Sequence, residues 1–480
     1  MDETHSNPPL WRRYLAYATV ALMPLVYNFE SLLHAKGPQY YSPLDFLLPL
    51  LLVLLGVDLA MKKPWARLKI PPAATLFWAG LALLSPVLTG GEGSILPKAA
   101  LSIVLFGTLA VWVFENIAAD AAEYRRLTLI LLASFGACVL LALKQYAGPQ
   151  GIPFDPDNQT QDLGGATAVR VAGWYGYRAA FGAQVALLVP AAAAVAFWDA
   201  NAIVRWASGV VAVLALCVTL AASGLWGACA GILAVACACA AARRWLTALT
   251  MLAVLLGLIC VVLPRLPREN MKVIARGSAL FADDQDGNRK PTARLRRYQA
   301  ALDLLSCPSN PRDEQSPPTW LKGVGVGRYQ ERVNRFYHTT AYPKPGRRTD
   351  DEAAYDMESD ERFSFSLLET TAVELGLPGL LALLFVFGAW IFGAHLSFAK
   401  LEASASPAAR VSAMLALAAL GSGCGAVVLA ALGNPMLPGV RGTFAFMLAL
   451  AFCVARWASG TCGNSVASRP QVETETAGSR

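Results

Sequence analysis

The feature that most constrains this chain is a series of apolar runs, each long enough to cross a lipid bilayer as a helix of about 20 residues. Leu, Ala and Val fill these runs without the polar alternation of a β-barrel strand, and a helix satisfies its own backbone in lipid. The sequence therefore predicts an all-α polytopic membrane protein with about twelve transmembrane helices. The expected spans lie near 14–33, 43–61, 71–89, 98–117, 127–146, 179–198, 203–221, 224–242, 246–263, 369–396, 411–432 and 442–457.

Composition supports membrane lipid as the solvent of this chain. Of its 480 residues, 55% are hydrophobic and only 15% are charged, which is too apolar for a soluble fold. The formal net charge is +7, but Lys and Arg are scattered among the loops between apolar runs. Since no single basic patch with interleaved aromatic residues results, we expect no nucleic-acid partner.

The cysteines and histidines give no sign of a metal site. Eight of the ten cysteines fall in apolar runs or at their edges, where they behave as small hydrophobic residues. The chain has only four histidines, too few and too dispersed for a multi-histidine centre. We expect no bound metal and no cofactor. At the N-terminus, Arg12 and Arg13 precede an apolar stretch without a small-x-small cleavage site, which indicates an uncleaved first helix.

Lys and Arg in the short loops predict the orientation, because short cytoplasmic loops carry an excess of these residues. One set of alternate loops holds the cations, whereas the loops at 34–42, 89–97 and 433–440 hold few. This pattern places both termini in the cytoplasm. The cations of the first set are Arg12, Arg13, Lys62, Lys63, Arg67, Lys69, Arg125, Arg126, Arg205, Arg243, Arg244, Lys400 and Arg410.

The same orientation divides the chain into four parts. Residues 1–263 hold nine helices together with an external loop at 147–178, and residues 264–366 form one large external loop. Three more helices occupy 367–457, and 458–480 is expected to be a disordered cytoplasmic tail. Within the large loop, the composition predicts a helix over Pro291–Leu305 and a solvated acidic stretch over Asp350–Glu361.

An external segment with two arginines directly precedes the sixth predicted helix. It reads Arg170-Val-Ala-Gly-Trp-Tyr-Gly-Tyr-Arg178. The guanidinium forks suit the oxygens of a pyrophosphate, and the aromatic faces suit sugar rings. The alternative interpretation is an interfacial aromatic belt with arginines that extend toward the membrane surface.

The large loop contains two further segments that could bind a substrate. Arg294, Arg297 and Tyr298 lie on the expected helix, where Arg294 and Tyr298 share a face. A Gly-x-Gly-x-Gly run follows at 323–327, but without a βαβ context it indicates a flexible turn more than a nucleotide loop.

Candidate general bases lie near the end of the same loop. Glu369 and Glu374 precede the purely apolar part of the tenth helix, at or above the membrane interface. Such carboxylates act as bases or pair with arginines, and pairing is the favoured interpretation. His338 is the only histidine of the large loop, and its ordinary pKa suits the deprotonation of a sugar hydroxyl. A structural role for His338 is the alternative.

In these segments the chain resembles the O-antigen ligase and O-antigen polymerase family of bacterial membrane glycan transferases. Three frames carry the resemblance, over roughly residues 125–400. They are an Arg then a Gly before a helix (Arg170, Gly173); an Arg four residues before an aromatic, then a Gly-x-Gly-x-Gly turn (Arg294, Tyr298, 323–327); and Ser366 followed by Gly376 and Gly379.

Two positions depart from the pattern of the family's ligases. Phe365 stands where those ligases carry a histidine associated with acceptor activation, and Ser223-Gly-Leu-Trp-Gly227 stands where an arginine is often found near the eighth helix. The missing histidine favours the polymerase-like branch of the family.

The resemblance implies a GT-C-like architecture in the bacterial inner membrane with the large loop in the periplasm. It also implies a metal-free reaction, with inversion at the sugar carbon, that transfers a glycan from undecaprenyl diphosphate to a hydroxyl of a growing glycan, of lipid A-core or of a protein. A transporter of a lipid-linked sugar and a non-catalytic assembly partner remain alternatives. The implied catalytic residues are His338 and Glu369, and those for diphosphate and glycan are Arg170, Arg178, Arg294, Arg297, Tyr298 and Arg441.

Overall fold

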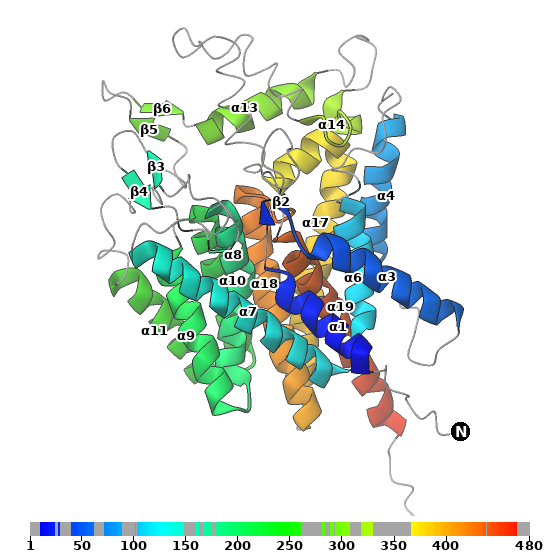
Figure 1. Cartoon of the computed structure of the whole chain (residues 1–480), viewed down its shortest axis with the longest axis vertical. Helices are drawn as coiled ribbons and strands as arrows, with labels where there is room; N and C mark the ends of the chain where they lie inside the picture. The colour runs from blue at the N-terminus through cyan, green and yellow to red at the C-terminus, as the bar shows by residue number, and fades with distance from the viewer. Residues whose placement is uncertain are drawn as a thin grey trace, which may run out of the picture.

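In the computed structural model, the protein is a bundle of helices with two smaller helices, α13 and α14, at one end (Figure 1). We call this the α13 end, and the other the opposite end. The structure describes residues 10–24, 27–28, 40–61, 72–88, 101, 103–118, 120–147, 160–162, 167–169, 171, 173–174, 178–219, 221–261, 281–283, 289–291, 293–307, 318–329, 366–404, 406–437 and 439–467.

Helices account for most of the described residues, as the apolar runs predict. Three short antiparallel strand pairs, β1 with β2, β3 with β4 and β5 with β6, add to them. The strands are β1 Tyr27–Asn28, β2 Tyr40–Tyr41, β3 Thr160–Asp162, β4 Thr167–Val169, β5 Phe281–Asp283 and β6 Arg289–Pro291. The helices are α1 Leu10–Leu22, α3 Leu44–Ala60, α4 Ala73–Leu88, η1 Leu105–Leu109, α6 Ala110–Ile117, α7 Ala121–Ala147, α8 Arg178–Trp198, α9 Ala202–Val218, α10 Ala222–Ala241, α11 Trp245–Val261, α13 Ala293–Ser306, α14 Thr319–Lys322, α17 Leu367–Glu402, α18 Pro407–Leu432 and α19 Arg441–Ala467.

Within the described residues, six helices are long and apolar enough to cross a membrane. They lie in α7, α8, α10, α17, α18 and α19, and four shorter apolar helices accompany them. This confirms an α-helical, multi-pass membrane protein. The predicted helix of the large loop, Pro291–Leu305, is also present as α13, which runs from Ala293 to Ser306.

The centre of the bundle is formed by α8, α10 and α18, which approach each other through small residues. A Cβ added to Gly231 would lie 2.3 Å from the ring of Pro190 and 2.5 Å from the carbonyl oxygen of Gly421. A Cβ on Gly425 would lie 2.2 Å from the carbonyl oxygen of Ala186. Because helices in lipid associate through close backbone packing, these glycines allow the three helices to form the core.

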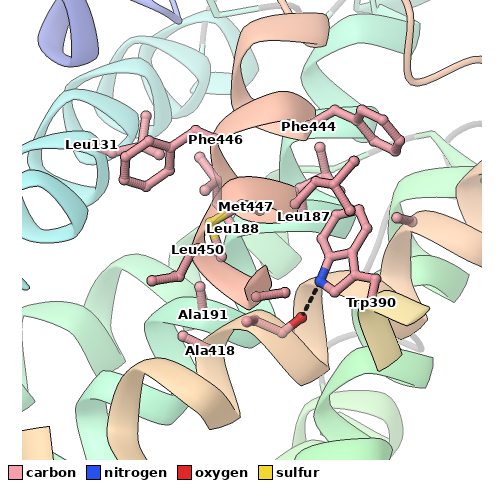
Figure 2. Close-up of a cluster of buried hydrophobic side chains, with 14 of the residues drawn as sticks. Leu131, Leu187, Leu188, Ala191, Trp390, Ala418, Phe444, Phe446, Met447 and Leu450 are labelled. Atoms are coloured by element: carbon pink, nitrogen blue, oxygen red, sulfur yellow. Dashed lines mark hydrogen bonds between the residues drawn. The ribbon is translucent and has the colours of Figure 1, made fainter. Parts of the chain in front are cut away.

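Large side chains fill the space between this centre and the helices α17 and α19. Trp390 and Phe444 are fully buried and pack edge to face, with ring centroids 5.5 Å apart (Figure 2). The Trp390 indole N–H donates to the carbonyl oxygen of Ala419 at 2.8 Å (Figure 2). The hydrogen bond satisfies the one polar atom of this side chain, so the indole is buried without an unpaired donor.

Ion pairs join helix ends at the opposite end of the bundle, where α18 begins and α19 ends (Figure 1). A carboxylate taken out of water requires a partner, and here each lies near the end of a helix where an arginine of another helix can reach it. These pairs are Arg12–Asp58, Arg13–Glu123, Arg125–Asp199, Arg244–Glu402 and Arg456–Glu115.

Candidate functional site

At the α13 end, the Gly-x-Gly-x-Gly run is a tight turn docked onto the beginning of α17. The backbone N–H of Val324 donates to the carbonyl oxygen of Val373 at 2.9 Å, and that of Gly325 donates to Glu374 at 3.0 Å. The three glycines have φ angles of 77°, 96° and 79°, in the left-handed region that favours glycine. A Cβ on Gly323 would lie 2.2 Å from the Glu374 carbonyl oxygen, so close docking also requires the absence of a side chain.

The beginning of α17 is set apart from the rest of that helix by a break at Gly376, which has φ 68° and ψ −170°. The segment after the break, 377–402, is about 39 Å long at 1.5 Å per residue, enough to cross a hydrocarbon core of about 30 Å. The segment before the break therefore exceeds what a span requires. It carries Glu369 and Glu374, and their predicted position at or above the membrane interface stays a prediction.

Both carboxylates of this segment accept a hydrogen bond from the same residue, Tyr329, which lies two residues after the docked turn. The buried Glu374 side chain accepts hydrogen bonds from the backbone N–H of Gly327 at 2.8 Å and of Tyr329 at 3.2 Å. The Tyr329 hydroxyl donates to Glu369 Oε1. For Glu374, two backbone N–H groups thus stand in the described structure where the sequence favoured an arginine.

A second group of hydrogen bonds fixes this site to the end of α18. The Ser366 hydroxyl donates to the carbonyl oxygen of Ala430 at 2.8 Å and accepts from the backbone N–H of Glu369 at 3.2 Å, so it caps α17. From α13, the Tyr298 hydroxyl donates to the carbonyl oxygen of Ala431 at 2.9 Å. Tyr298, Ser366 and Glu369 are therefore held around one helix end, although α13 and α17 are far apart in the sequence.

Arg441 lies at the first residue of α19, near the same end of the bundle. Its guanidinium pairs with Asp45 of α3 and lies 4.3 Å from the ring centroid of Phe106. Both contacts favour a cation at this place. The side-chain amide of Gln184, in α8, donates to the carbonyl oxygen of Gly439, which lies in the loop before α19. Arg441 is thus held at the start of α19 by an acidic partner and an aromatic ring.

The backbone of Gly173 is held by a single side chain, that of Gln145. The amide of Gln145, near the end of α7, accepts from the Gly173 N–H at 2.9 Å and donates to its carbonyl oxygen at 3.2 Å. Gly173 has φ 58°, which explains the glycine that follows Arg170 in the predicted motif. These two hydrogen bonds hold Gly173 at the end of α7.

Three predicted site residues, Tyr298, Glu369 and Arg441, thus have described side chains at the α13 end. Arg178 is the first residue of α8, and Arg294 and Arg297 lie in α13, but their side chains lie outside the described part. Arg170 and His338 lie outside the described residues altogether. The convergence of the arginines on one cavity therefore stays a prediction.

Three residues of this end were not among the predicted site residues. Tyr329 closes the glycine turn, Ser85 accepts from the backbone N–H of Val326 at 2.9 Å, and Asp45 pairs with Arg441. Asp45 had a signal in the sequence, since an acidic residue within an apolar run is costly unless it is partnered. The role of Ser85 had none, because serine is common in spanning helices and its partner lies 241 residues away.

Among the residues that the structure describes, no three His, Cys, Asp or Glu side chains are grouped so that they could hold a metal ion. Comparison with models of known protein families finds no match, and comparison with curated proteins finds no relative.

Proposed function

We propose that this protein is a bacterial inner-membrane glycan transferase with about twelve spans and both termini in the cytoplasm. In the proposed reaction an acceptor hydroxyl oxygen attacks the anomeric carbon of a glycan carried on undecaprenyl diphosphate. The new glycosidic bond forms as the bond to the diphosphate oxygen breaks. The hydroxyl proton passes to a protein base, and undecaprenyl diphosphate leaves.

The observation that carries this proposal is the contact between two motif segments, the glycine turn 323–327 and the start of α17. The resemblance to O-antigen ligases and polymerases rests on these segments, which are distant in sequence. In the structure the two segments are hydrogen-bonded to each other, and Tyr329, just after the turn, is hydrogen-bonded to the start of α17. Their glycines stand where side chains would clash or strain the backbone. A shared motif that builds one local structure supports a common site.

The carboxylates at this site suit different roles. Glu374 is only 4% exposed, and its oxygens accept from two backbone N–H groups, so we assign it a structural role. Glu369 is partly exposed at the first turn of α17 and touches the Tyr329 hydroxyl. We therefore propose Glu369 as the base that takes the acceptor proton, with His338 as the alternative.

The leaving diphosphate requires positive charge, because two phosphate groups develop negative charge as the glycosyl bond breaks. We assign the binding of the diphosphate to Arg170, Arg178, Arg294 and Arg297, together with Arg441. Tyr298 supplies an aromatic face for a sugar ring. The acceptor is a growing glycan in the favoured, polymerase-like form of the proposal.

The test uses purified protein in lipid nanodiscs with an undecaprenyl-diphosphate-linked oligosaccharide and an unlabelled acceptor glycan. We expect free undecaprenyl diphosphate and an elongated glycan in equal amounts. Glu369→Gln should lower the turnover about 10²–10⁴-fold if Glu369 is the base. Glu402→Gln is the matched control, since Glu402 lies at the opposite end in a pair with Arg244. Translocation of intact donor in liposomes, without release of the diphosphate, would instead identify a transporter.

The acceptor class is resolved by deletion of the gene and analysis of surface glycans. Glycans capped at a single repeat indicate a polymerase, and carrier-linked polymer beside bare lipid A-core indicates a ligase. Complementation with Arg170→Ala, Arg294→Ala and His338→Ala then tests the assigned roles. Normal expression and wild-type glycan from both arginine variants would refute the diphosphate site.

A further inference from the structure

A separate feature is a cavity between α9 and α11. α9 packs on α8, and α11 packs on α10, but α9 and α11 diverge and leave a space of about 610 Å³ between them. Phe197 of α8, Val210 of α9 and Leu258 of α11 line its walls. The volume falls within the range of about 300–1,000 Å³ that is usual for ligand pockets.

The lining is apolar except near one mouth. Arg205 and Thr250 are the polar residues of the lining, and both lie within the first two turns of their helices, α9 and α11. These helix starts lie at the opposite end of the bundle, beside Asp199 and the turn between α10 and α11. The cavity thus has a cationic mouth and an apolar depth, as a molecule with an anionic head and a hydrocarbon chain requires.

Arg205 is available for such a head group. The nearby carboxylate of Asp199 is already held by both arms of the Arg125 guanidinium, at 2.7 and 2.8 Å. Arg205 itself is exposed, and Trp206 beside it is 77% exposed. An arginine and a tryptophan at the end of an apolar helix in a membrane protein suit the level of the lipid head groups.

A neighbouring cavity is also apolar but has no arginine in its lining. It lies between α7 and α9, has a volume of about 760 Å³ and shares Trp206, Val210 and Leu214 with the first cavity. Its lining contains no charged residue. The two cavities therefore differ in the presence of Arg205, not in their apolar character.

We propose that the cavity between α9 and α11 binds an anionic membrane phospholipid, with an acyl chain between the helices and the phosphate at Arg205. Guanidinium groups bind phosphate through paired hydrogen bonds, and apolar walls within the membrane are in contact with lipid chains. This site is independent of the proposed transferase activity, because its Arg205 mouth lies at the opposite end of the bundle and its lining includes none of the residues assigned to that reaction.

Native mass spectrometry of the detergent-purified protein tests the proposal with dioleoyl phosphatidylglycerol and dioleoyl phosphatidylcholine as probes. We expect retained phosphatidylglycerol at concentrations where phosphatidylcholine is lost. Arg205→Ala should weaken phosphatidylglycerol binding about fivefold, the effect of one surface cation. Arg410→Ala, an exposed arginine at the same end that lines neither cavity, should leave binding unchanged. Equal binding of both lipids, or wild-type binding by Arg205→Ala, would overturn the proposal.

A second variant tests the cavity rather than the charge. A Cβ added to Gly209 would meet only Ala196, at an ordinary contact distance of 3.6 Å, so a side chain at this position extends toward the cavity without a backbone clash. Gly209→Leu should therefore keep a monodisperse gel-filtration profile while it reduces phosphatidylglycerol binding. Unchanged binding in a folded Gly209→Leu protein would contradict the site. Neither measurement uses a glycan, so a failure here leaves the transferase proposal to its own test.

Discussion

Among the ion pairs described at the opposite end, we expect the Arg125–Asp199 pair to contribute strongly to the stability of the fold. Asp199 has no exposed side-chain surface and accepts from Arg125 at 2.7 and 2.8 Å. Arg125→Ala leaves this buried carboxylate with the Asn201 N–H as its only described hydrogen-bond donor, so we expect a loss of about 3 kcal/mol in the free energy of unfolding. Arg244→Ala is the control: Arg244 is 58% exposed in its pair with Glu402, and its loss should cost about 0–1 kcal/mol. Denaturation titrations in mixed micelles measure both, and equal losses would contradict the assignment.

The same pair predicts a pH dependence. Burial by itself raises the pKa of Asp199, but hydrogen bonds from Arg125 and from the backbone N–H of Asn201 outweigh it, so the pKa lies below its ordinary value of 3.8. A carboxyl with a lowered pKa in the folded state stabilises the fold above the unfolded pKa and loses that contribution as the pH falls. Without Arg125, burial raises the pKa of Asp199 in the folded variant, so the difference in stability between wild type and Arg125→Ala should shrink as the pH falls from neutral toward the ordinary value of 3.8 and below it. A difference that grows on acidification would refute this.

Glu374 is a second residue whose role follows from its partners. Glu374→Ala would leave the backbone N–H of the buried Tyr329 without its acceptor, whereas that of the exposed Gly327 can turn to water, so we expect a cost of about 1–3 kcal/mol. Glu374→Gln retains one side-chain oxygen and should cost less. Hydrogen exchange at residues 324–329 should rise in the alanine variant and much less in the glutamine variant. Equal exchange in both variants would show that the turn does not depend on this side chain.

At the scale of elements, α17 combines what the sequence predicts with what it does not. Its apolar run predicted a helix near 369–396, and α17 runs from Leu367 to Glu402. The break at Gly376 was not predicted, because glycine within an apolar run is common in spanning helices. The break results from a tertiary contact. A Cβ on Gly376 would lie 2.9 Å from the backbone oxygens of Trp320 and Leu321, which belong to the large loop.

This contact gives a prediction for the element as a whole. Gly376→Ala adds a Cβ at φ 68° and against α14, so we expect a loss of stability above about 1 kcal/mol and faster proteolysis near Trp320. Gly388→Ala lies in the same helix with no atom within 4 Å of the added Cβ, and should be neutral or stabilising by up to about 1 kcal/mol. Limited proteolysis and denaturation of both variants compare them, and a tolerated Gly376→Ala would exclude the role assigned to the break.

The candidate site was also predictable only in part, because its tertiary contacts join residues that are distant in the sequence. Spacing along the chain indicated Tyr298, Glu369 and the glycine turn, since each belongs to a local pattern. The partners of Tyr298 and Ser366, the carbonyl oxygens of Ala431 and Ala430, carry no sequence signal because every residue has a carbonyl group. Packing of α8, α10 and α18 was equally hidden, because glycine and alanine are abundant in all the apolar runs.

At the scale of the whole molecule, charge is sorted between the two ends of the bundle. The cations expected in the cytoplasm include Arg12, Arg125 and Arg244, and each pairs with a carboxylate at the opposite end. The α13 end holds the carboxylate site and the Arg441–Asp45 pair. Since short cytoplasmic loops carry the excess of Lys and Arg, the sorting predicts that α13 faces the periplasm.

Reporter fusions test this orientation directly. Alkaline phosphatase, which is active only in the periplasm, should be active when fused after residue 307 and inactive after residue 404, in the turn between α17 and α18. A fluorescent protein that folds only in the cytoplasm should give the reverse result at the same positions. Because α17 is the one candidate spanning helix described between the two fusion points, opposite results at these points indicate that α17 crosses the membrane. The same reporter active at both positions would place α17 on one side, and the inverted pattern would place the carboxylate site in the cytoplasm, where a carrier-linked glycan in the outer leaflet cannot reach it.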